Sequence, residues 1–208
     1  MKKITVFLIA LFVIFQVSAQ EKIKLPAPDK TGGMPLMEAL SKRTTTRSFS
    51  TKEISQQQLS NVIWAAFGIN RPDGKRTAPS TRNFQGTDIY VLLKSGAYKY
   101  EPKEHQLIQV SKKDIRAVGS SQAFVKDAPV QLILISDLTK CGNGSNEEKI
   151  NVSNIDAGYI SQNIYLCCAS EGLATGARGS LDRKAISEEL SLKETQSIMI
   201  AHCVGYSK

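Results

Sequence analysis

The segment from residue 154 to residue 171 limits the possible folds of this chain more than any other. It is long enough for about five helical turns, and apolar residues fall on nearly every side of such a helix. An ordinary surface helix carries a single apolar stripe, whereas a helix that is apolar all round needs cover on every side. We therefore expect this helix to be enclosed, either by a sheet of the same chain or by a second subunit.

Several segments have the pattern of β-strands. Residues 130–135 are apolar apart from Gln131, which predicts a central strand buried on both faces. Residues 89–93 and 97–100 predict a hairpin that turns at Ser95 and Gly96, and residues 197–204 predict a final strand. Because strands and helices do not alternate regularly, we expect one α+β domain and not a doubly wound sheet.

Helix signals mark other segments. Pro35 is placed to open a helix that runs to about Arg43. Residues 55–58 (Ser-Gln-Gln-Gln) form a capping box ahead of an apolar helical face, which Gly68 closes. Two short helices are predicted at residues 111–117 and 120–126, and a polar surface loop at residues 141–151.

The first 19 residues have the composition of a secretory signal peptide. Lys2 and Lys3 precede an apolar run, which ends in the small-residue pattern Val17-Ser18-Ala19. The run is too short to span a bilayer comfortably. We therefore expect a cleaved signal over residues 1–19 and an exported, periplasmic or secreted protein. Residues 20–208 have the length of one domain.

Charge and cysteine content exclude several classes of protein. Without Lys2 and Lys3, 25 basic and 19 acidic residues remain, a net charge of +6. The basic residues are scattered, without interleaved aromatic residues or a helix-turn-helix pattern, so nucleic acid is not an expected partner. The sequence has no Cys-x-x-Cys and no His-Glu-x-x-His, so we predict no metal. We expect the four cysteines to be small buried apolar residues.

Two common kinds of catalytic site also lack support. There is no Gly-x-Gly-x-x-Gly after a predicted strand, which argues against a built-in nicotinamide dinucleotide site. Neither His105 nor His202 has the Ser/Asp or Cys/Asn company of a nucleophilic triad in an interpretable motif. We therefore expect both histidines to be structural.

Two polar motifs suggest a binding site for a phosphate-bearing aromatic cofactor. Residues 43–49 read Arg-Thr-Thr-Thr-Arg-Ser-Phe, and residues 78–85 read Ala-Pro-Ser-Thr-Arg-Asn-Phe-Gln. A phosphate requires basic side chains and hydroxyls, while an electron-poor ring requires amides and a cation. These motifs supply both sets of groups, and the second lies on an irregular segment of the kind that often binds ligands.

The two motifs resemble those of the nitroreductase family of FMN-dependent oxidoreductases. A third match follows in the same order, with Gln-Asn-Ile-Tyr-Leu at 162–166, Gly-Leu at 172–173 and Val-Gly-Tyr at 204–206. The resemblance implies a central, mostly antiparallel sheet flanked by helices, a homodimer, and bound FMN. The pattern Tyr98-x-Tyr100 together with residues 104–107 is similar to the branch that includes azoline dehydrogenases.

The first motif is expected to bind the phosphate end of the cofactor. If the helix persists, Arg43 and Arg47 share one face and can converge on one phosphate; a solvated, cationic helix end is the alternative. Thr44 and Thr45 add hydroxyls. By family correspondence, Arg47 lies near the pyrimidine end of the ring, where a cation stabilises the reduced flavin.

The other cofactor residues follow from the resemblance. The segment that includes Pro79, Ser80, Thr81 and Asn83 covers the flavin of the partner subunit, with an ordinary turn as the alternative. Position 178–179 presents main-chain amides to the ring nitrogen that receives hydride, so the side chain at 178 is free to vary. The remaining candidates are Arg178, Gly179 and Gln122. Gln122 either forms hydrogen bonds with the pyrimidine edge of the flavin or lies on a helix surface.

The expected function is oxidoreduction of a small molecule in two steps, with a donor that reduces the flavin and an acceptor that reoxidises it. The alternative is a binding protein that keeps the fold without flavin. Thr44 favours it, since the family usually has Arg-Ser or His-Ser at 44–45, and so does a sequence that ends soon after Tyr206, where many members carry further basic residues. The electron donor stays open, because nicotinamide dinucleotides are cytoplasmic.

Overall fold

The computed structural model describes residues 20–208, so the predicted signal peptide lies outside the described residues. One seven-stranded sheet organises this part of the chain, in the order β1-β4-β3-β2-β5-β7-β6. Every neighbouring pair in it is antiparallel. The strands are β1 Lys22–Lys24, β2 Thr87–Leu93, β3 Gly96–Glu101, β4 Gln106–Ser111, β5 Val130–Asp137, β6 Ala174–Arg178 and β7 Gln196–Gly205.

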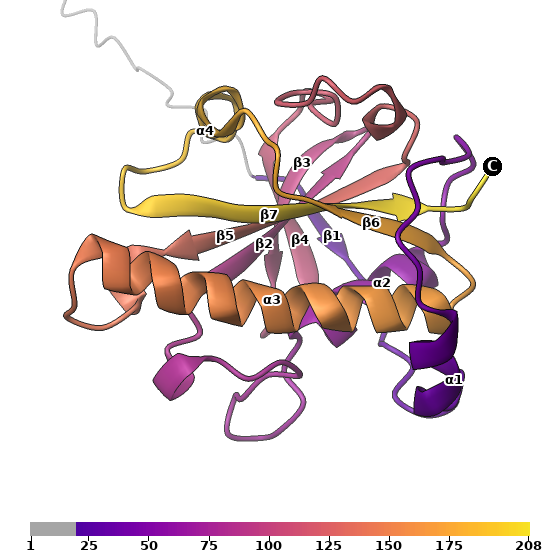
Figure 1. Ribbon diagram of the computed structural model, residues 1–208, viewed down its shortest axis with the longest axis horizontal. Helices are drawn as coiled ribbons and strands as arrows, with labels where there is room; N and C mark the ends of the chain where they lie inside the picture. The colour runs from indigo at the N-terminus through magenta and orange to yellow at the C-terminus, as the bar shows by residue number, and fades with distance from the viewer. Residues whose placement is uncertain (1–19) are drawn as a thin grey trace, which may run out of the picture.

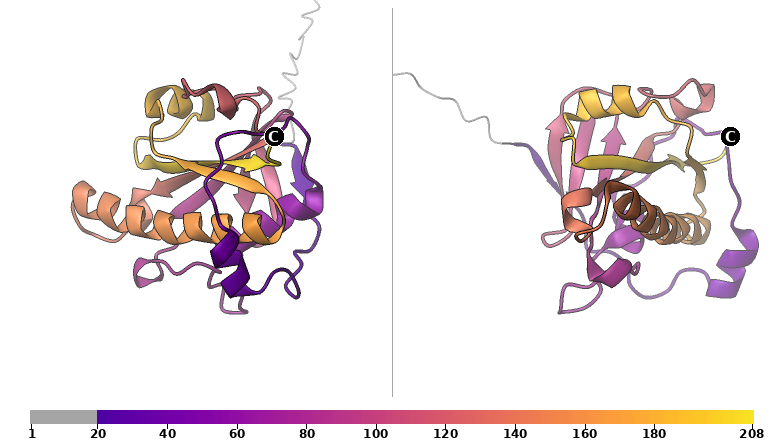
Figure 2. Two further views of the ribbon diagram at one scale, coloured as in Figure 1. Left: turned by 45° about the vertical axis from the view of Figure 1, so that its right-hand side comes forward. Right: turned by 60° about the vertical axis from the view of Figure 1, so that its left-hand side comes forward.

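Helices cover both faces of the sheet. The two longer ones, α2 and α3, lie on one face and α4 lies on the other, as Figures 1 and 2 show. The helices are α1 Leu36–Lys42, α2 Gln56–Phe67, α3 Asn146–Ser170 and α4 Arg183–Leu190, with short 3-10 turns η1 Thr81–Asn83, η2 Ala123–Val125 and η3 Leu138–Lys140. The fold is the expected α+β architecture with an antiparallel sheet between helical layers.

The central strand β5 divides the core in two. Leu132 and Leu134 face α2 and α3, while Ile133 and Ile135 face α4. These side chains are fully buried, which confirms the prediction of a strand covered on both faces. Burial of each such side chain contributes about 1.5–3 kcal/mol relative to exposure, so β5 anchors both layers.

Local signals predicted α2 and the hairpin correctly. The Ser55 hydroxyl accepts from the Gln58 amide and the Gln58 side chain accepts from the Ser55 amide, which is the expected capping box. Gly68 ends the helix, since its amide donates to the Trp64 carbonyl. In the hairpin, Leu93 pairs with Gly96, so the turn consists of Lys94 and Ser95, one residue earlier than predicted.

The long helix begins earlier than predicted. α3 starts at Asn146, so part of the segment assigned to a surface loop is helical. Ser145 and Glu148 form a second capping box, a start signal that the polar composition of this stretch obscured. The sheet covers one side of α3, while Ile155 and Tyr159 on it remain exposed.

The short helix predicted at residues 111–117 does not form. Ser111 is the last residue of β4, and the chain then turns so that Ile115 is buried against the α4 side of the sheet. The Asp114 carboxylate accepts from the Arg116 amide and guanidinium, a local bond that competes with helical hydrogen bonding. Only η2 forms within the other predicted helix, at residues 120–126. No helix within residues 20–208 combines the length and apolarity needed to cross a membrane.

Candidate functional site

The first motif runs along the free edge of β6 and not along a helix. α1 ends at Lys42, and Arg43 already has an extended backbone. The Thr46 amide donates to the Thr175 carbonyl over 2.9 Å. The helix therefore does not persist to Arg47, and the shared helix face that its persistence would give Arg43 and Arg47 does not form. β-Branched threonines favour extended backbone. In this extended form the segment also has a hydrogen-bond acceptor at the sheet edge, which a longer helix would not provide.

Tyr165 of α3 contacts two residues of the first motif. Its hydroxyl lies 3.0 Å from the Thr45 hydroxyl, and its ring centre lies 5.3 Å from the Arg43 guanidinium carbon. The Ala177 amide of β6 also donates to the Tyr165 hydroxyl, over 2.9 Å. Arg43, Thr45 and the edge of β6 thus converge through a residue to which the sequence motif gave no individual role.

The edge of β6 also places Gly179. Along a strand, alternate residues present their main-chain groups to the same edge. The Thr175 carbonyl and the Ala177 amide both face the free edge, so the Gly179 amide comes next in this series. Gly179 is exposed, with open space where a side chain would begin. This position suits a main-chain hydrogen-bond donor.

The side chain of Arg178, unlike that edge, is buried in the core. Its side chain is only 5% exposed, and its Nη2 donates to Gln131 Oε1 over 2.6 Å. Its Nε and Nη1 atoms are buried without a hydrogen-bond partner in the described chain. A buried cation with unpaired donors is costly, so the expectation that side-chain identity is free at position 178 does not fit the structure.

Gln122 lies in the same neighbourhood. It is the residue before η2, and its Oε1 atom is also buried without a partner among the described residues. Gln131 links η2 to Arg178, because Gln131 donates to the Val125 carbonyl of η2 and accepts from Arg178. The unpaired buried donors of Arg178 and the unpaired buried acceptor of Gln122 therefore lie on either side of Gln131 in β5.

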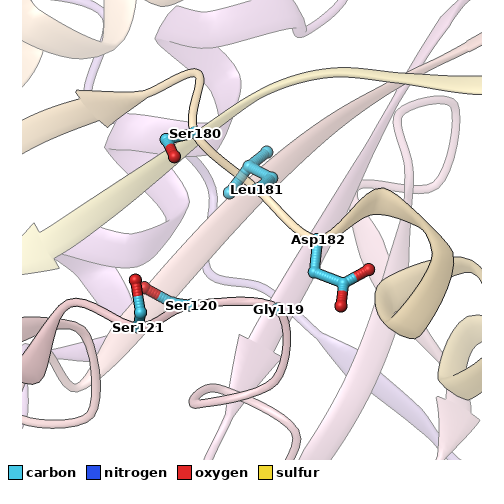
Figure 3. Close-up of a pocket in the computed structure, with 6 residues that line it drawn as sticks. All are labelled: Gly119, Ser120, Ser121, Ser180, Leu181 and Asp182. Atoms are coloured by element: carbon cyan, nitrogen blue, oxygen red, sulfur yellow. The ribbon is translucent and has the colours of Figure 1, made fainter.

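A cavity of about 410 Å³ opens beside these residues. Figure 3 shows Ser180, Leu181 and Asp182 on the segment between β6 and α4, and Ser120 and Ser121 on the loop that faces it. One wall of the cavity therefore follows directly after Gly179, and the other directly precedes Gln122. The sequence did not predict this cavity, because its two walls are about sixty residues apart.

The second motif lies elsewhere on α3. The Thr81 amide and hydroxyl each donate to Asp156 Oδ1 over 2.9 Å, and Asp156 is 5% exposed. Tyr165 lies nine residues further along α3, about 14 Å along the helix axis. In Figure 1, α1 accordingly lies at the right-hand end of α3, whereas η1 lies below the left-hand half of this helix. Within one subunit, residues 79–85 and the Arg43 group do not form one site.

The backbone of the second motif is strained. Arg82, Asn83 and Gln85 all have positive φ angles, of 48°, 57° and 49°. Gln85 maintains this shape, since its side chain donates to Asn83 Oδ1 and accepts from Arg76 Nε. Strain of this kind is found where a segment is held for binding or catalysis. The supporting Arg76 and Asp156 carry no sequence signal that points to the motif.

The charges of the site are unneutralised. None of the ion pairs of residues 20–208 includes Arg43, Arg47 or Arg178. Burial and the Arg178 charge lower the pKa of His202 to about 3, so this histidine stays neutral. Burial raises the pKa of Cys203 to about 11, so its thiol is not a nucleophile. The site therefore offers cations and hydrogen-bond donors to a ligand, and no activated nucleophile.

Comparison with known proteins identifies the family. The Nitroreductase family model matches residues 40–206, which include the first and second motifs, β6 and β7. The chain belongs to the nitroreductase family. Nitroreductase family membership places the protein among oxidoreductases.

Individual nitroreductases agree over most of the chain. A crystal structure described as a nitroreductase from Ralstonia eutropha is 36% identical with a TM-score of 0.86, covering 92% of this chain and 91% of that one. A protein from Methanocaldococcus jannaschii named as a nitroreductase is 26% identical over 183 residues, 83% of this chain and 91% of its own. A structure described as an NAD(P)H:FMN oxidoreductase from Staphylococcus epidermidis shares the fold, with a TM-score of 0.65 at 15% identity over 87% of this chain and 91% of that one.

Proposed function

We propose that this protein is an FMN-dependent oxidoreductase that acts on a small molecule. The observation that carries the proposal is the convergence of Arg43, Thr45 and the free edge of β6 on Tyr165, without a neutralising carboxylate. Cations and hydroxyls suit a phosphate, and main-chain donors suit the polar edge of a flavin ring. The unpaired buried atoms of Arg178 and Gln122 are consistent with a polar ligand nearby.

Each group of residues has a distinct task in this proposal. Arg43, Thr44 and Thr45 bind the phosphate end, and Arg47 supplies positive charge near the ring. The Gly179 amide is a main-chain donor to the ring. Bound flavin supplies hydride and electron transfer. The chain binds and orients the reactants, which agrees with a site that contains no activated nucleophile.

The proposed assembly is a homodimer. Most of the large apolar side chains that are exposed lie on α1 and α3, and Met37 is 75% exposed. On α3, Ile155 and Tyr159 flank Asp156, the residue that binds Thr81. An interface on this face would bring the motif with Pro79, Ser80, Thr81 and Asn83 to the partner subunit, where it would complete the partner's flavin site. The exposed residues on this face are Leu36, Met37, Leu40, Ile155 and Tyr159.

Location and substrate complete the proposal. The sequence of residues 1–19 supports export to the periplasm or beyond, where a reductant other than a nicotinamide dinucleotide would be required. The azoline-dehydrogenase-like branch is part of the proposal because Tyr100 and His105, which carry that resemblance, form a hydrogen bond of 2.9 Å.

A comparison of FMN with riboflavin tests the cofactor assignment. Protein comprising residues 20–208 is purified, its visible spectrum is recorded, and both flavins are titrated by fluorescence. FMN should bind at least tenfold more tightly than riboflavin, because only FMN carries the phosphate that the cations bind. Colourless protein that binds neither flavin would favour the flavin-free binding protein, which the replacement of a basic residue by Thr44 also suggests.

A further inference from the structure

We propose that Tyr165 is the positioning residue of this site, which directs the Thr45 hydroxyl and the Arg43 guanidinium toward an oxyanion of the ligand. The inference rests on the proposed function, because the oxyanion in question is the phosphate of FMN. Tyr165 contacts three separate parts of the site: the guanidinium of Arg43, the hydroxyl of Thr45, and the Ala177 amide of β6.

One of the two hydrogen bonds at the Tyr165 hydroxyl has a fixed direction. An amide N–H only donates, so the Tyr165 oxygen accepts from Ala177. The other partner of this hydroxyl among the described residues is Thr45 Oγ1, 3.0 Å away, and either hydroxyl can donate to the other. In the proposed arrangement, Tyr165 donates its hydrogen to the Thr45 oxygen. The hydrogen of the exposed Thr45 hydroxyl is then left to donate outward, to an oxygen of a ligand.

The ring of Tyr165 acts on Arg43 in a complementary way. The guanidinium lies over the ring, 5.3 Å from its centre, in a cation–π arrangement. A carboxylate in place of the ring would hold Arg43 but would also neutralise its charge and occupy its donors. An aromatic ring fixes the cation and leaves both its charge and its N–H groups available for an anionic ligand.

The opposite side of Tyr165 is rigid. The His202 ring lies edge-on to it, with ring centres 5.1 Å apart. His202 is fully buried and is held through Ser161 at 2.8 Å and Thr175 at 3.1 Å. Since Thr175 donates to the Cys203 carbonyl, it accepts from His202 Nδ1, and Nε2 accepts from Ser161. Tyr165 thus packs against a neutral imidazole that two hydrogen bonds hold in place.

A double-mutant cycle on FMN affinity tests the hydroxyl. Tyr165→Phe keeps the ring and removes the hydrogen bonds, while Thr45→Val removes the outward donor. Each variant should bind FMN about tenfold more weakly, and the double variant should bind no more than about tenfold more weakly, because both changes remove the same contact. As a matched control, Tyr165→Phe combined with Asn83→Ala should multiply the two separate effects. Wild-type affinity in Tyr165→Phe, or multiplied effects in the Tyr165–Thr45 pair, would overturn the proposal.

A flavin-free measurement tests the ring. Inorganic phosphate is titrated while the NMR signal of Arg43 Nε–H, assigned with the Arg43→Lys variant, is followed in wild type, Tyr165→Phe and Tyr165→Leu. The signal should show a ring-current shift in the first two proteins and lose it in the third, which should also need several-fold more phosphate. Equal shifts and equal phosphate responses in all three would refute the role of Tyr165. A wild type that passes this measurement but does not bind FMN would refute the FMN assignment alone.

Discussion

At the scale of single residues, the two arginines of the first motif have different surroundings. Arg43 is half-buried and lies over the Tyr165 ring, whereas Arg47 is exposed. The proposed roles differ in the same way. A phosphate has the same charge in both redox states of FMN, while the ring gains negative charge on reduction. Only a cation at the ring therefore stabilises one redox state over the other.

The Arg43→Ala variant should lose affinity for FMN. Loss of hydrogen bonds to a charged group costs about 1.5–3 kcal/mol, so the dissociation constant, measured by fluorescence titration, should rise by at least tenfold. Lys103→Ala is a suitable control, because Lys103 is exposed in the turn between β3 and β4. An unchanged dissociation constant in Arg43→Ala would exclude Arg43 from the site.

The Arg47→Ala variant should change the chemistry of the flavin more than its binding. Without this cation the reduced ring is less stable, so the midpoint potential should fall and reduction should slow. Potential and affinity are measured on the same preparation and compared with Arg43→Ala. If Arg47→Ala abolishes binding without a change in potential, Arg47 is a second phosphate ligand.

At the scale of elements, α3 supports two sites at once. Its Asp156 binds Thr81 of the second motif, and its Tyr165 binds the first motif. These partners are 75 and 120 residues apart in the chain, so no local pattern could reveal them. In contrast, the start of α2 depends on Ser55 and Gln58, three residues apart, and was predictable.

The Asp156→Ala variant should release the second motif. The Thr81 amide and hydroxyl would lose their acceptor, which costs about 1–3 kcal/mol, and the strained turn at Arg82 and Asn83 would open. Trypsin should then cleave after Arg82 faster than in wild type. Asp127→Ala, which removes a surface ion pair with Lys208, is the control. Equal cleavage rates in all three proteins would show that Asp156 does not hold this segment.

At the scale of the whole molecule, the layered fold was predictable and the site geometry was not. The apolar residues of β5 and the hairpin of β2 and β3 have local signals, and both elements were confirmed, with the turn one residue earlier than predicted. The helix was expected to end near Arg43, but the form of the segment from Arg43 to Arg47 depends on the distant edge of β6. Likewise, Ile115 left its predicted helix because its burial is decided by α4.

Stability should fall when the pH drops below about 6.5. Burial lowers the pKa of His202 to about 3 and also lowers the pKa of His105. Below about 6.5 the unfolded chain therefore binds more protons than the folded protein, and stability is lost by up to about 1.4 kcal/mol per pH unit for each histidine. Urea unfolding at pH 7.5 and 5.5 measures this loss, and His105→Gln should reduce it. Equal stability at both pH values would contradict the lowered pKa values of the two histidines.

The protein should be a dimer at micromolar concentration. An obligate interface buries about 2,000 Å² or more, and the exposed apolar residues of α1 and α3 provide its centre. Light scattering should report twice the chain mass for wild type and a shift toward monomer for Tyr159→Lys. A monomeric wild type would contradict both the dimer and the shared flavin site.

The contacts at the free edge of β6 bear on the solubility of the protein as well as on ligand binding. An unpaired strand edge invites strands from other molecules, and here the Thr46 amide and the Tyr165 hydroxyl occupy part of that edge. The contacts that arrange the site therefore also prevent the sheet from extending into a neighbouring molecule. A variant that loses these contacts is therefore expected to aggregate more readily than wild type, in addition to binding its ligand more weakly.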